Sequence, residues 1–232
     1  MLGRVWRWLL KAVGLLMVLS VLIVLLFRFV PLPGSMVMAE RWVSSRLAGE
    51  PLAIDYHWRG RAQLSDQAAI AVIAAEDQRF PYHPGFDFHQ IRHSLKAWWF
   101  EDRPLRGAST ISQQTARNVF LWTQRSWLRK GLEVWFTALI ELLWPKTRIL
   151  EVYLNVVELD HGVFGFQAAA RHYYGIDAAR LGADRAARLA AILPDPRHRS
   201  PTHPDARVLE HARWIRQQMR QLGGTAYLKE LR

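Results

Sequence analysis

The most apolar part of the chain lies at its N-terminus. No residue from Ala12 to Phe27 is charged, and the apolar character extends from Trp6 to Val30 because the aliphatic stem of Lys11 can carry its amine toward water. This length lies within the roughly 17–25 residues that a membrane-spanning helix needs, and tryptophans near its start suit the membrane interface. The pattern therefore predicts a retained transmembrane anchor. A cleaved secretory signal is the alternative, although the apolar run is long for one and no small-x-small cleavage site follows it.

Beyond this anchor, the spacing of apolar residues is mainly helical. Apolar positions recur every three or four residues in a series of segments, several of which begin with a hydroxyl residue that can cap a helix. The helices predicted in this way are Met36–Leu47, Ser65–Glu76, His89–Phe100, one from Ser109 or Thr110 to Val119, Ser126–Trp144, Thr147–Leu159, Phe164–Tyr174, Ala183–Leu193 and Arg207–Leu222. Alternation predicts an extended segment over Pro51–Gly60, and prolines and glycines predict loops over Phe80–Gly85 and Pro104–Gly107. We expect one mainly α domain after the anchor.

The chain carries an excess of basic residues. Lys and Arg number 31 against 20 Asp and Glu, which gives a formal net charge of +11. Such a charge attracts anionic lipid headgroups, diphosphates and nucleic acids alike. The predicted anchor favours lipid headgroups and diphosphates. No helix-turn-helix, RNA-binding or zinc signature is present, so no nucleic-acid partner is expected. Arg4, Arg7 and Lys11 precede the anchor, and the positive-inside tendency places the N-terminus in the cytoplasm and the remainder across the membrane.

One acidic residue with a candidate chemical role is Glu76. It ends the very apolar Ser65–Glu76 helix, where partial burial would raise its pKa toward that of a general base. A solvated helix end is the ordinary alternative, because most acidic residues at the ends of elements are exposed.

A second candidate acid, Glu133, lies among cations. Arg129 and Lys130 precede it by four and three residues, which places both beside the carboxylate on one helix. An ordinary helix ion pair would explain this spacing. Arg117 and Arg125 enlarge the positive group, however, and such a group suits a diphosphate whose charge must be held while it leaves.

The run from Gly107 to Gln114 is rich in uncharged hydrogen-bonding side chains, a composition suited to binding sugars. A capped helix start with exposed glutamines is the alternative. No Ser-x-x-Lys, Ser-x-Asn or Lys-Thr-Gly sequence occurs, which excludes penicillin-sensitive acyl transfer, and the absence of cysteine excludes thiolate chemistry. His89 and His93 are four residues apart without a third candidate ligand nearby, so no metal site is expected.

These segments together resemble the monofunctional peptidoglycan glycosyltransferases, which are relatives of the glycosyltransferase domain of bifunctional penicillin-binding proteins. The matching motifs follow the family's order: Glu76–Phe80 with His83–Gly85, Gly107–Asn118, Arg129–Glu133, Ile149–Asn155 with Gly162 and Gly165, and Ala190–Pro194. Two positions depart from the family pattern, Arg117 where Lys is usual and Asp160 where Gly is usual. Arg keeps the charge of Lys but replaces its compact ammonium group with a planar guanidinium group, whose N–H donors are arranged differently.

The resemblance implies a fold and a set of site residues. The fold is a lysozyme-like helical glycosyltransferase domain with a small membrane-proximal jaw, over residues 35–232, after an anchor over residues 1–34. Glu76 is implied as the general base, and Glu133 as the second catalytic acid, which positions cations or assists departure. The implied substrate-binding residues are Asp77, Phe80, His83, Gly85, Gly107, Ser109, Thr110, Gln113, Gln114, Arg117, Asn118, Arg125, Arg129, Lys130, Glu151, Tyr153 and Asn155.

The resemblance also implies a reaction and its setting. Lipid II, the undecaprenyl-diphosphate-linked disaccharide pentapeptide, would be polymerised into β-1,4-linked strands by an inverting displacement at the periplasmic face of the inner membrane. No cofactor is implied as a requirement, and a divalent ion, Mg²⁺ or Mn²⁺, stays open at the diphosphate. Other cell-wall synthesis and division proteins are candidate partners. Apolar residues that could face the membrane, with a place in the core as the alternative, are Trp98, Trp99, Phe100, Phe120, Leu121 and Trp122.

Two rival functions remain. A lysozyme-like muramidase or lytic transglycosylase also uses two carboxylates around a sugar bond. Such an enzyme has no diphosphate to stabilise, so the basic cluster argues against it. An inactive membrane-anchored scaffold for cell-wall assembly is the other, and it would require damaged motifs, whereas both acids are present.

Overall fold

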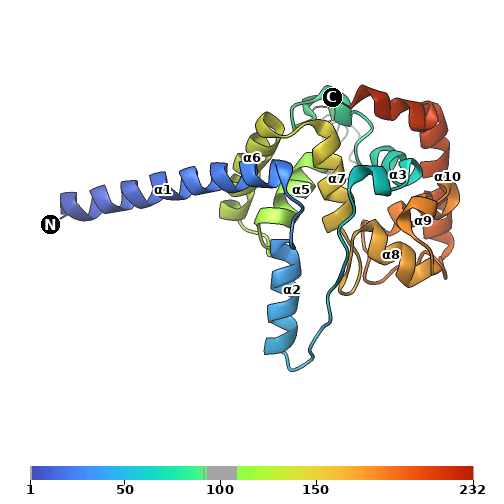
Figure 1. The fold of residues 1–232 in the computed structure, drawn as a ribbon, viewed down its shortest axis with the longest axis horizontal. Coiled ribbons are helices and arrows are strands. Elements are labelled where there is room, and N and C mark those ends of the chain that lie inside the picture. The colour runs from blue at the N-terminus through green and yellow to red at the C-terminus, as the bar shows by residue number, and fades with distance from the viewer. Residues whose placement is uncertain (1, 91, 93–108, 232) are drawn as a thin grey trace.

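The computed structural model describes residues 2–90, 92 and 109–231, and it confirms the mainly α fold with one apolar N-terminal helix (Figure 1). The α-helices are α1 Leu2–Phe29, α2 Met36–Leu47, α3 Asp66–Glu76, α5 Ile111–Phe120, α6 Trp127–Leu143, α7 Lys146–Val156, α8 Gly165–Tyr174, α9 Ala183–Ile192 and α10 Ala206–Gln221. Short 3-10 helices are η1 Arg61–Gln63, η2 Phe80–Tyr82, η3 Ala178–Arg180 and η4 Gly224–Glu230. The strands are β1 Asp55–Tyr56, β2 Glu158–Asp160 and β3 Val163–Phe164.

Three of the four helix starts that were predicted from a capping hydroxyl residue are confirmed. The hydroxyl groups of Ser65, Thr110 and Ser126 accept hydrogen bonds from backbone amides in the first turns of α3, α5 and α6. The predicted start of α7 at Thr147 is wrong, because Pro145 is the N-cap and the helix begins at Lys146, one residue before Thr147. That helix also ends earlier than predicted, since the chain then turns into β2. Most of the predicted helix over 89–100 and the predicted loop over 104–107 fall outside the described residues.

Helix α3 is the centre of the hydrophobic core. Every residue from Ala68 to Ala74 is fully buried, as the apolar sequence on all sides of this helix predicts. α9, α10 and η4 pack around it, and Figure 1 shows these elements on the side of the body away from α1. A helix enclosed in this way has little freedom to move, so the residue at its C-terminal end, Glu76, has a fixed position.

A small sheet joins the segment after α2 to the region around α7. The strand order is β1-β3-β2, with β1 parallel and β2 antiparallel to β3. The side chain of Asn155 accepts a hydrogen bond from the Arg59 amide at 2.8 Å and donates one to the Arg59 carbonyl at 2.8 Å. Gly165 has φ +81, and a Cβ there would lie 2.3 Å from the Asn155 carbonyl oxygen, so this close packing requires glycine.

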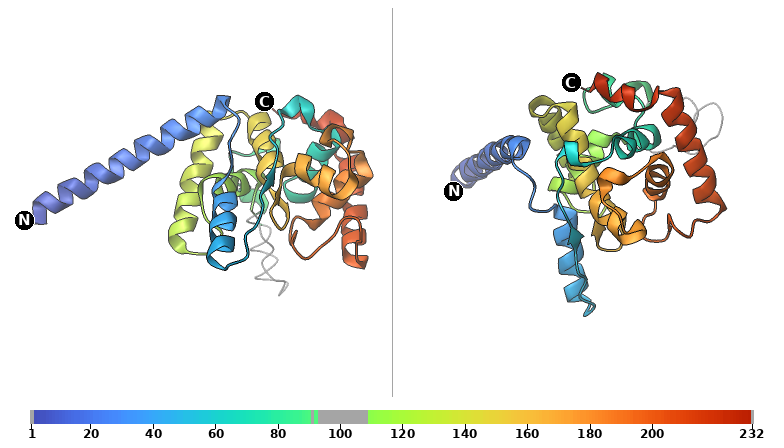
Figure 2. Two further views of the ribbon diagram at one scale, coloured as in Figure 1. Left: turned by 60° about the horizontal axis from the view of Figure 1, so that its bottom comes forward. Right: turned by 45° about the vertical axis from the view of Figure 1, so that its right-hand side comes forward.

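Helix α1 is the membrane anchor. Its segment Val5–Phe29 is long and apolar enough to cross a membrane, and almost all of it is exposed. Its C-terminal part is held against the body: the Trp144 indole donates to the Val24 carbonyl at 2.7 Å, and the Trp135 indole donates to the Ser20 hydroxyl at 3.0 Å. Figure 2 shows α1 leaving the body beyond this contact with α6.

The apolar surface near the anchor differs from the predicted one. Trp98, Trp99 and Phe100 lie outside the described residues, and Leu121 is a core residue with 2% exposure. Phe120 stacks on Phe136 with ring centroids 4.5 Å apart. Exposed apolar side chains instead project from α2 and α6, namely Trp42, Val43, Leu47, Trp127, Leu128, Val134 and Leu142. These are the side chains that suit contact with lipid.

Candidate active site

Glu76 is held by a neutral hydrogen-bond donor. The Gln114 side-chain amide on α5 donates to the Glu76 carboxylate at 2.7 Å, and the hydroxyl of the fully buried Tyr153 donates to the Gln114 carbonyl oxygen at 3.3 Å. Burial raises the pKa of the Glu76 carboxyl above its ordinary value, and the Gln114 hydrogen bond and electrostatic interactions with His211 and Arg117 offset only part of this rise. The carboxylate is therefore a stronger proton acceptor than a solvated Glu.

A cation-rich cavity of about 280 Å³ borders this hydrogen-bond chain. It is lined by Val37, Arg41, Gln114, Arg117, Asn118, Thr123, Arg125, Arg129, Val157, Glu158, Leu193 and Pro196. Arg41 forms a bidentate ion pair with Glu158. Arg117 and Arg125 form no ion pair with any residue that the structure describes, so their guanidinium groups are available to an anion.

Glu133 does not line this cavity, but it binds Arg129, which does. Its side chain is buried, accepts a hydrogen bond from the Arg129 guanidinium at 2.6 Å and forms an ion pair with Lys130. The spacing-based prediction that both cations lie beside this carboxylate is thus confirmed. Arg129 and Gln114 both line the cavity, and Gln114 also bonds to Glu76. The two predicted acids are therefore linked to one cavity through Gln114 and Arg129.

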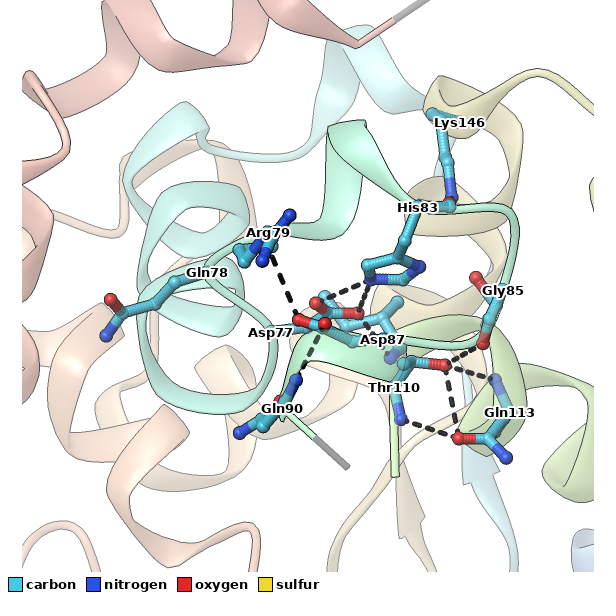
Figure 3. A network of polar contacts seen from close by, with 12 residues as sticks. Asp77, Gln78, Arg79, His83, Gly85, Asp87, Gln90, Thr110, Gln113 and Lys146 are labelled. Atoms are coloured by element: carbon cyan, nitrogen blue, oxygen red, sulfur yellow. Dashed lines mark hydrogen bonds and ion pairs between the residues drawn. The ribbon is translucent and has the colours of Figure 1, made fainter. Parts of the chain in front are cut away.

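Several motif residues form the frame beneath the site (Figure 3). The buried Asp77 carboxylate bonds the His83 ring nitrogen Nε2 at 2.8 Å and accepts from the Ile111 amide at 3.0 Å, which joins the turn after α3 to the start of α5. The Thr110 hydroxyl donates to the Gly85 carbonyl at 2.6 Å. Gly85 has φ +84, and a Cβ there would lie 2.8 Å from two side chains of α6.

Other predicted substrate-binding residues also have partners within the protein. Gln113 completes the capping box of α5 with Thr110, which confirms the capped helix start that the sequence left open, but Gln113 is buried and not exposed as that alternative expected. Phe80 is buried beneath the ammonium group of Lys146, and Glu151 pairs with Arg148 at 2.6 Å. Gly107 lies outside the described residues. Asp160, a departure from the family pattern, accepts a hydrogen bond from the Tyr173 hydroxyl at 2.7 Å and so ties β2 to α8.

Three potential metal ligands meet in the frame. Single ligand atoms of Asp77, His83 and Asp87 lie within 4.8 Å of one another. These groups already serve protein contacts: Asp77 binds His83 and the Ile111 amide, and Asp87 accepts from the Gln90 amide at 3.0 Å. The cluster is thus accounted for by packing of the turn, and the expected absence of a metal site stays a prediction.

A second cavity of about 530 Å³ lies beside Glu76 and contains no residue of α2. It is lined by Ala75, Glu76, Asp77, Gln78, Arg79, Asp87, His89, Gln90, Ser109, His211 and Trp214. Of the predicted sugar-binding run, Ser109 lines this cavity and Gln114 lines the cation-rich one. Sequence analysis missed Arg41, His211 and Trp214. Only Trp214 gave a signal, as a large aromatic residue in a polar helix.

Comparison with known proteins now identifies the family. The model of a family described as "Transglycosylase" matches residues 53–220. The chain belongs to this transglycosylase family. Among its relatives is a protein of Chromohalobacter salexigens that is 61% identical over 230 residues, covering 99% of this chain and 98% of the relative. A Pseudomonas aeruginosa relative is 53% identical over 231 residues, covering 100% of this chain and 99% of the relative.

Both relatives bear the name biosynthetic peptidoglycan transglycosylase, and so does a Pseudomonas fluorescens protein that is 56% identical over 212 residues, covering 91% of this chain and 88% of the relative. The transglycosylase match contains α3 and α5 to α9, together with most of α10. It therefore includes both acids and most of the wall of each cavity. The anchor and α2, which contributes Arg41, precede it.

Proposed function

We propose that this protein is a peptidoglycan glycosyltransferase that polymerises lipid II into β-1,4-linked glycan strands and releases undecaprenyl diphosphate. One observation carries the proposal: Glu76, a carboxyl with a raised pKa, is joined through its hydrogen bond with Gln114 to a cavity in which two arginines have no ion-pair partner within the described chain. A base and an anion site joined by one residue, Gln114, suit a reaction that removes a proton from one reactant and releases a diphosphate from the other.

In the proposed reaction, Glu76 is the general base. The 4-hydroxyl oxygen of the acceptor sugar attacks the anomeric carbon of the donor, the bond from that carbon to the diphosphate oxygen breaks, and the hydroxyl proton passes to Glu76. The configuration at the anomeric carbon is inverted because the attack and the departure occur on opposite faces. The raised pKa of Glu76 supports this role, since a base works best when its pKa lies near the working pH.

The cations stabilise the leaving group. Arg117 and Arg125 would bind the diphosphate, and Arg129 would join them from a position fixed by Glu133. Glu133 is thus a positioning residue in this proposal, since it lies behind Arg129 and is not in the cavity wall. These side chains supply positive charge without a cofactor, and Mg²⁺ or Mn²⁺ is the candidate addition at the diphosphate.

The proposal also assigns a cellular setting. Residues 1–34 form the cytoplasmic N-terminus and the inner-membrane anchor, and residues 35–232 form a periplasmic catalytic domain. Hydrogen bonds from α6 and α7 to the end of α1 support a retained anchor, because they make this helix part of the folded protein. An enzyme anchored in this way shares the membrane with its lipid-linked substrate, which raises their effective concentration. Other cell-wall synthesis and division proteins are the proposed protein partners.

The experiment that tests this function uses the purified full-length protein in liposomes. Lipid II is added with and without EDTA, and glycan products are separated by gel electrophoresis. We expect polymer in both samples. A parallel incubation with purified cell wall tests the lytic alternative: released fragments without polymer from lipid II would indicate a hydrolase or lytic enzyme, and no product in either assay would favour the inactive scaffold.

A further inference from the structure

The cavity beside Glu76 has an aromatic wall on α10. Trp214 and His211 both line it, together with the general base proposed above. Trp214 is 42% exposed although it belongs to a helix that packs on α3 and α9. A tryptophan with a large exposed fraction beside a candidate active site is a candidate ligand-binding residue, because its apolar ring gains from being covered.

The orientation of this indole is fixed by its neighbours. The rings of His211 and Trp214 are stacked, with centroids 5.7 Å apart and an angle of 27° between their planes. His211 in turn lies with Nδ1 3.2 Å from the Ala191 carbonyl oxygen, which can only accept a hydrogen bond, so Nδ1 carries a proton. The α9 backbone thus holds His211, and His211 supports Trp214. A flat ring held in one orientation loses little entropy when a ligand covers it.

The polar groups of this cavity differ from those of the cation-rich one. Arg79 faces the opposite charge of Asp87 at 4.0 Å, and neutral hydrogen-bonding groups are supplied by Gln78, Gln90 and Ser109. The lining also contains the carboxyl groups of Glu76 and Asp77, so acidic side chains outnumber its one arginine, and such a lining does not select a diphosphate. Together with an exposed aromatic ring, these polar groups suit a sugar, which has an apolar C–H face and a rim of hydroxyl groups.

We propose that Trp214, supported by His211, binds a sugar ring of the growing glycan strand beyond the bond being formed. This inference rests on the proposed function and names a strand-binding site within it. α10 lies on the side of the body away from α1 and α2 (Figure 1), whereas the cation-rich cavity includes residues of α2. Both lipid diphosphates must stay near the membrane. The growing strand is the reactant that extends away from it, so it is the one that reaches α10.

The test separates the first coupling from later extension. One assay couples two lipid II molecules, and the other extends a preformed lipid-linked glycan of several disaccharides, both with full-length protein in liposomes. Trp214→Ala should slow extension about tenfold relative to wild type, a loss typical of removing one aromatic contact, and leave the first coupling nearly unchanged. Trp214→Phe keeps an aromatic surface and should recover most of the extension rate. Arg213→Ala, at an exposed neighbouring position of α10, is the matched control.

The outcomes distinguish this site from the proposed function. Slower extension with normal coupling, together with shorter products, supports the strand site. Equal losses in both assays would indicate general damage to the enzyme and overturn it, as would an unchanged extension rate in Trp214→Ala. If wild-type protein fails to couple two lipid II molecules, the proposed function itself is overturned.

Discussion

The two acids of this protein lie in similar apolar surroundings and have different partners. Glu76 ends the buried helix α3 and accepts a hydrogen bond from the neutral Gln114. Glu133 lies within α6, with a side-chain exposure of 3%, and pairs with Arg129 and Lys130. Burial raises the pKa of Glu76, whereas in Glu133 two adjacent positive charges compensate the buried negative one. The partner, more than the burial, therefore separates a candidate base from a positioning residue.

Removing the charge of Glu76 should have the largest effect on activity. Glu76→Gln keeps the size of the side chain and an oxygen that can accept the Gln114 hydrogen bond. Loss of the base should lower the polymerisation rate on the order of 10²–10⁴-fold. Polymer formation from lipid II measures the rate, and Glu50→Gln, at an exposed position in a loop, is the control. Turnover close to that of wild type would remove Glu76 from the role of base.

The matching change in Glu133 should act first on stability. Glu133→Gln leaves the buried Arg129 guanidinium without its counter-charge, which should lower the free energy of unfolding by about 3–5 kcal/mol. Thermal unfolding in detergent measures this loss. The double variant Glu133→Leu with Arg129→Met removes both buried charges and should regain much of the stability, but not the activity, since Arg129 belongs to the cavity. Full activity of the double variant would contradict the role of Arg129.

Substitutions of Arg117 in the cation-rich cavity should have a smaller effect, and its size should depend on the residue introduced. Arg117→Ala should raise the KM for lipid II about tenfold or more, because a hydrogen bond to a charged group is lost. Arg117→Lys restores the residue that is usual in the family and should stay within about threefold of wild type, since the charge is kept and only the donor geometry changes. Initial rates over a range of lipid II concentrations give KM and kcat. An equal loss in both variants would show that lipid II binding needs the planar guanidinium group of Arg117 and not only its charge.

The sequence predicted the helices well because their signals are local. Ser65, Thr110 and Ser126 cap their helices as expected, and the all-round apolar pattern of α3 predicted its burial. The same locality explains the confirmed contacts of Glu133, whose partners lie three and four residues away on one helix. The error at α7 is also local, since Thr147 can cap a helix but the preceding Pro145 already occupies the N-cap position.

The residues that line each cavity could not be predicted from local sequence patterns, because they come from elements that are distant along the chain. Asp77 and His83 belong to a motif, but the sequence does not tell whether they contact a substrate or each other, and the structure places them together in the buried frame. Arg41 reaches the cation-rich cavity from α2, and Trp214 reaches Glu76's cavity from α10, far along the chain. Such residues gain a candidate role only when the fold brings them to the site.

The smallest predicted effect is the pH dependence of thermal stability, which should differ between the Glu76 and Glu133 variants. The pKa of Glu76 is higher in the folded protein than in the unfolded chain, so ionising this residue lowers stability as pH rises from its ordinary value of 4.5 through the raised folded value. Glu76→Gln removes that loss and should raise Tm at neutral pH, by roughly 2–4 °C for each kcal/mol of unfolding free energy regained. The gain should become small near pH 4, where most Glu76 side chains are protonated in both states. Tm measured for wild type and variant from pH 4 to 8 gives the difference, and a Tm gain that stays constant over this range would mean that the charge of Glu76 is not its cause.

Glu133→Gln should instead lower Tm at neutral pH, so the two Glu→Gln changes are expected to shift stability in opposite directions.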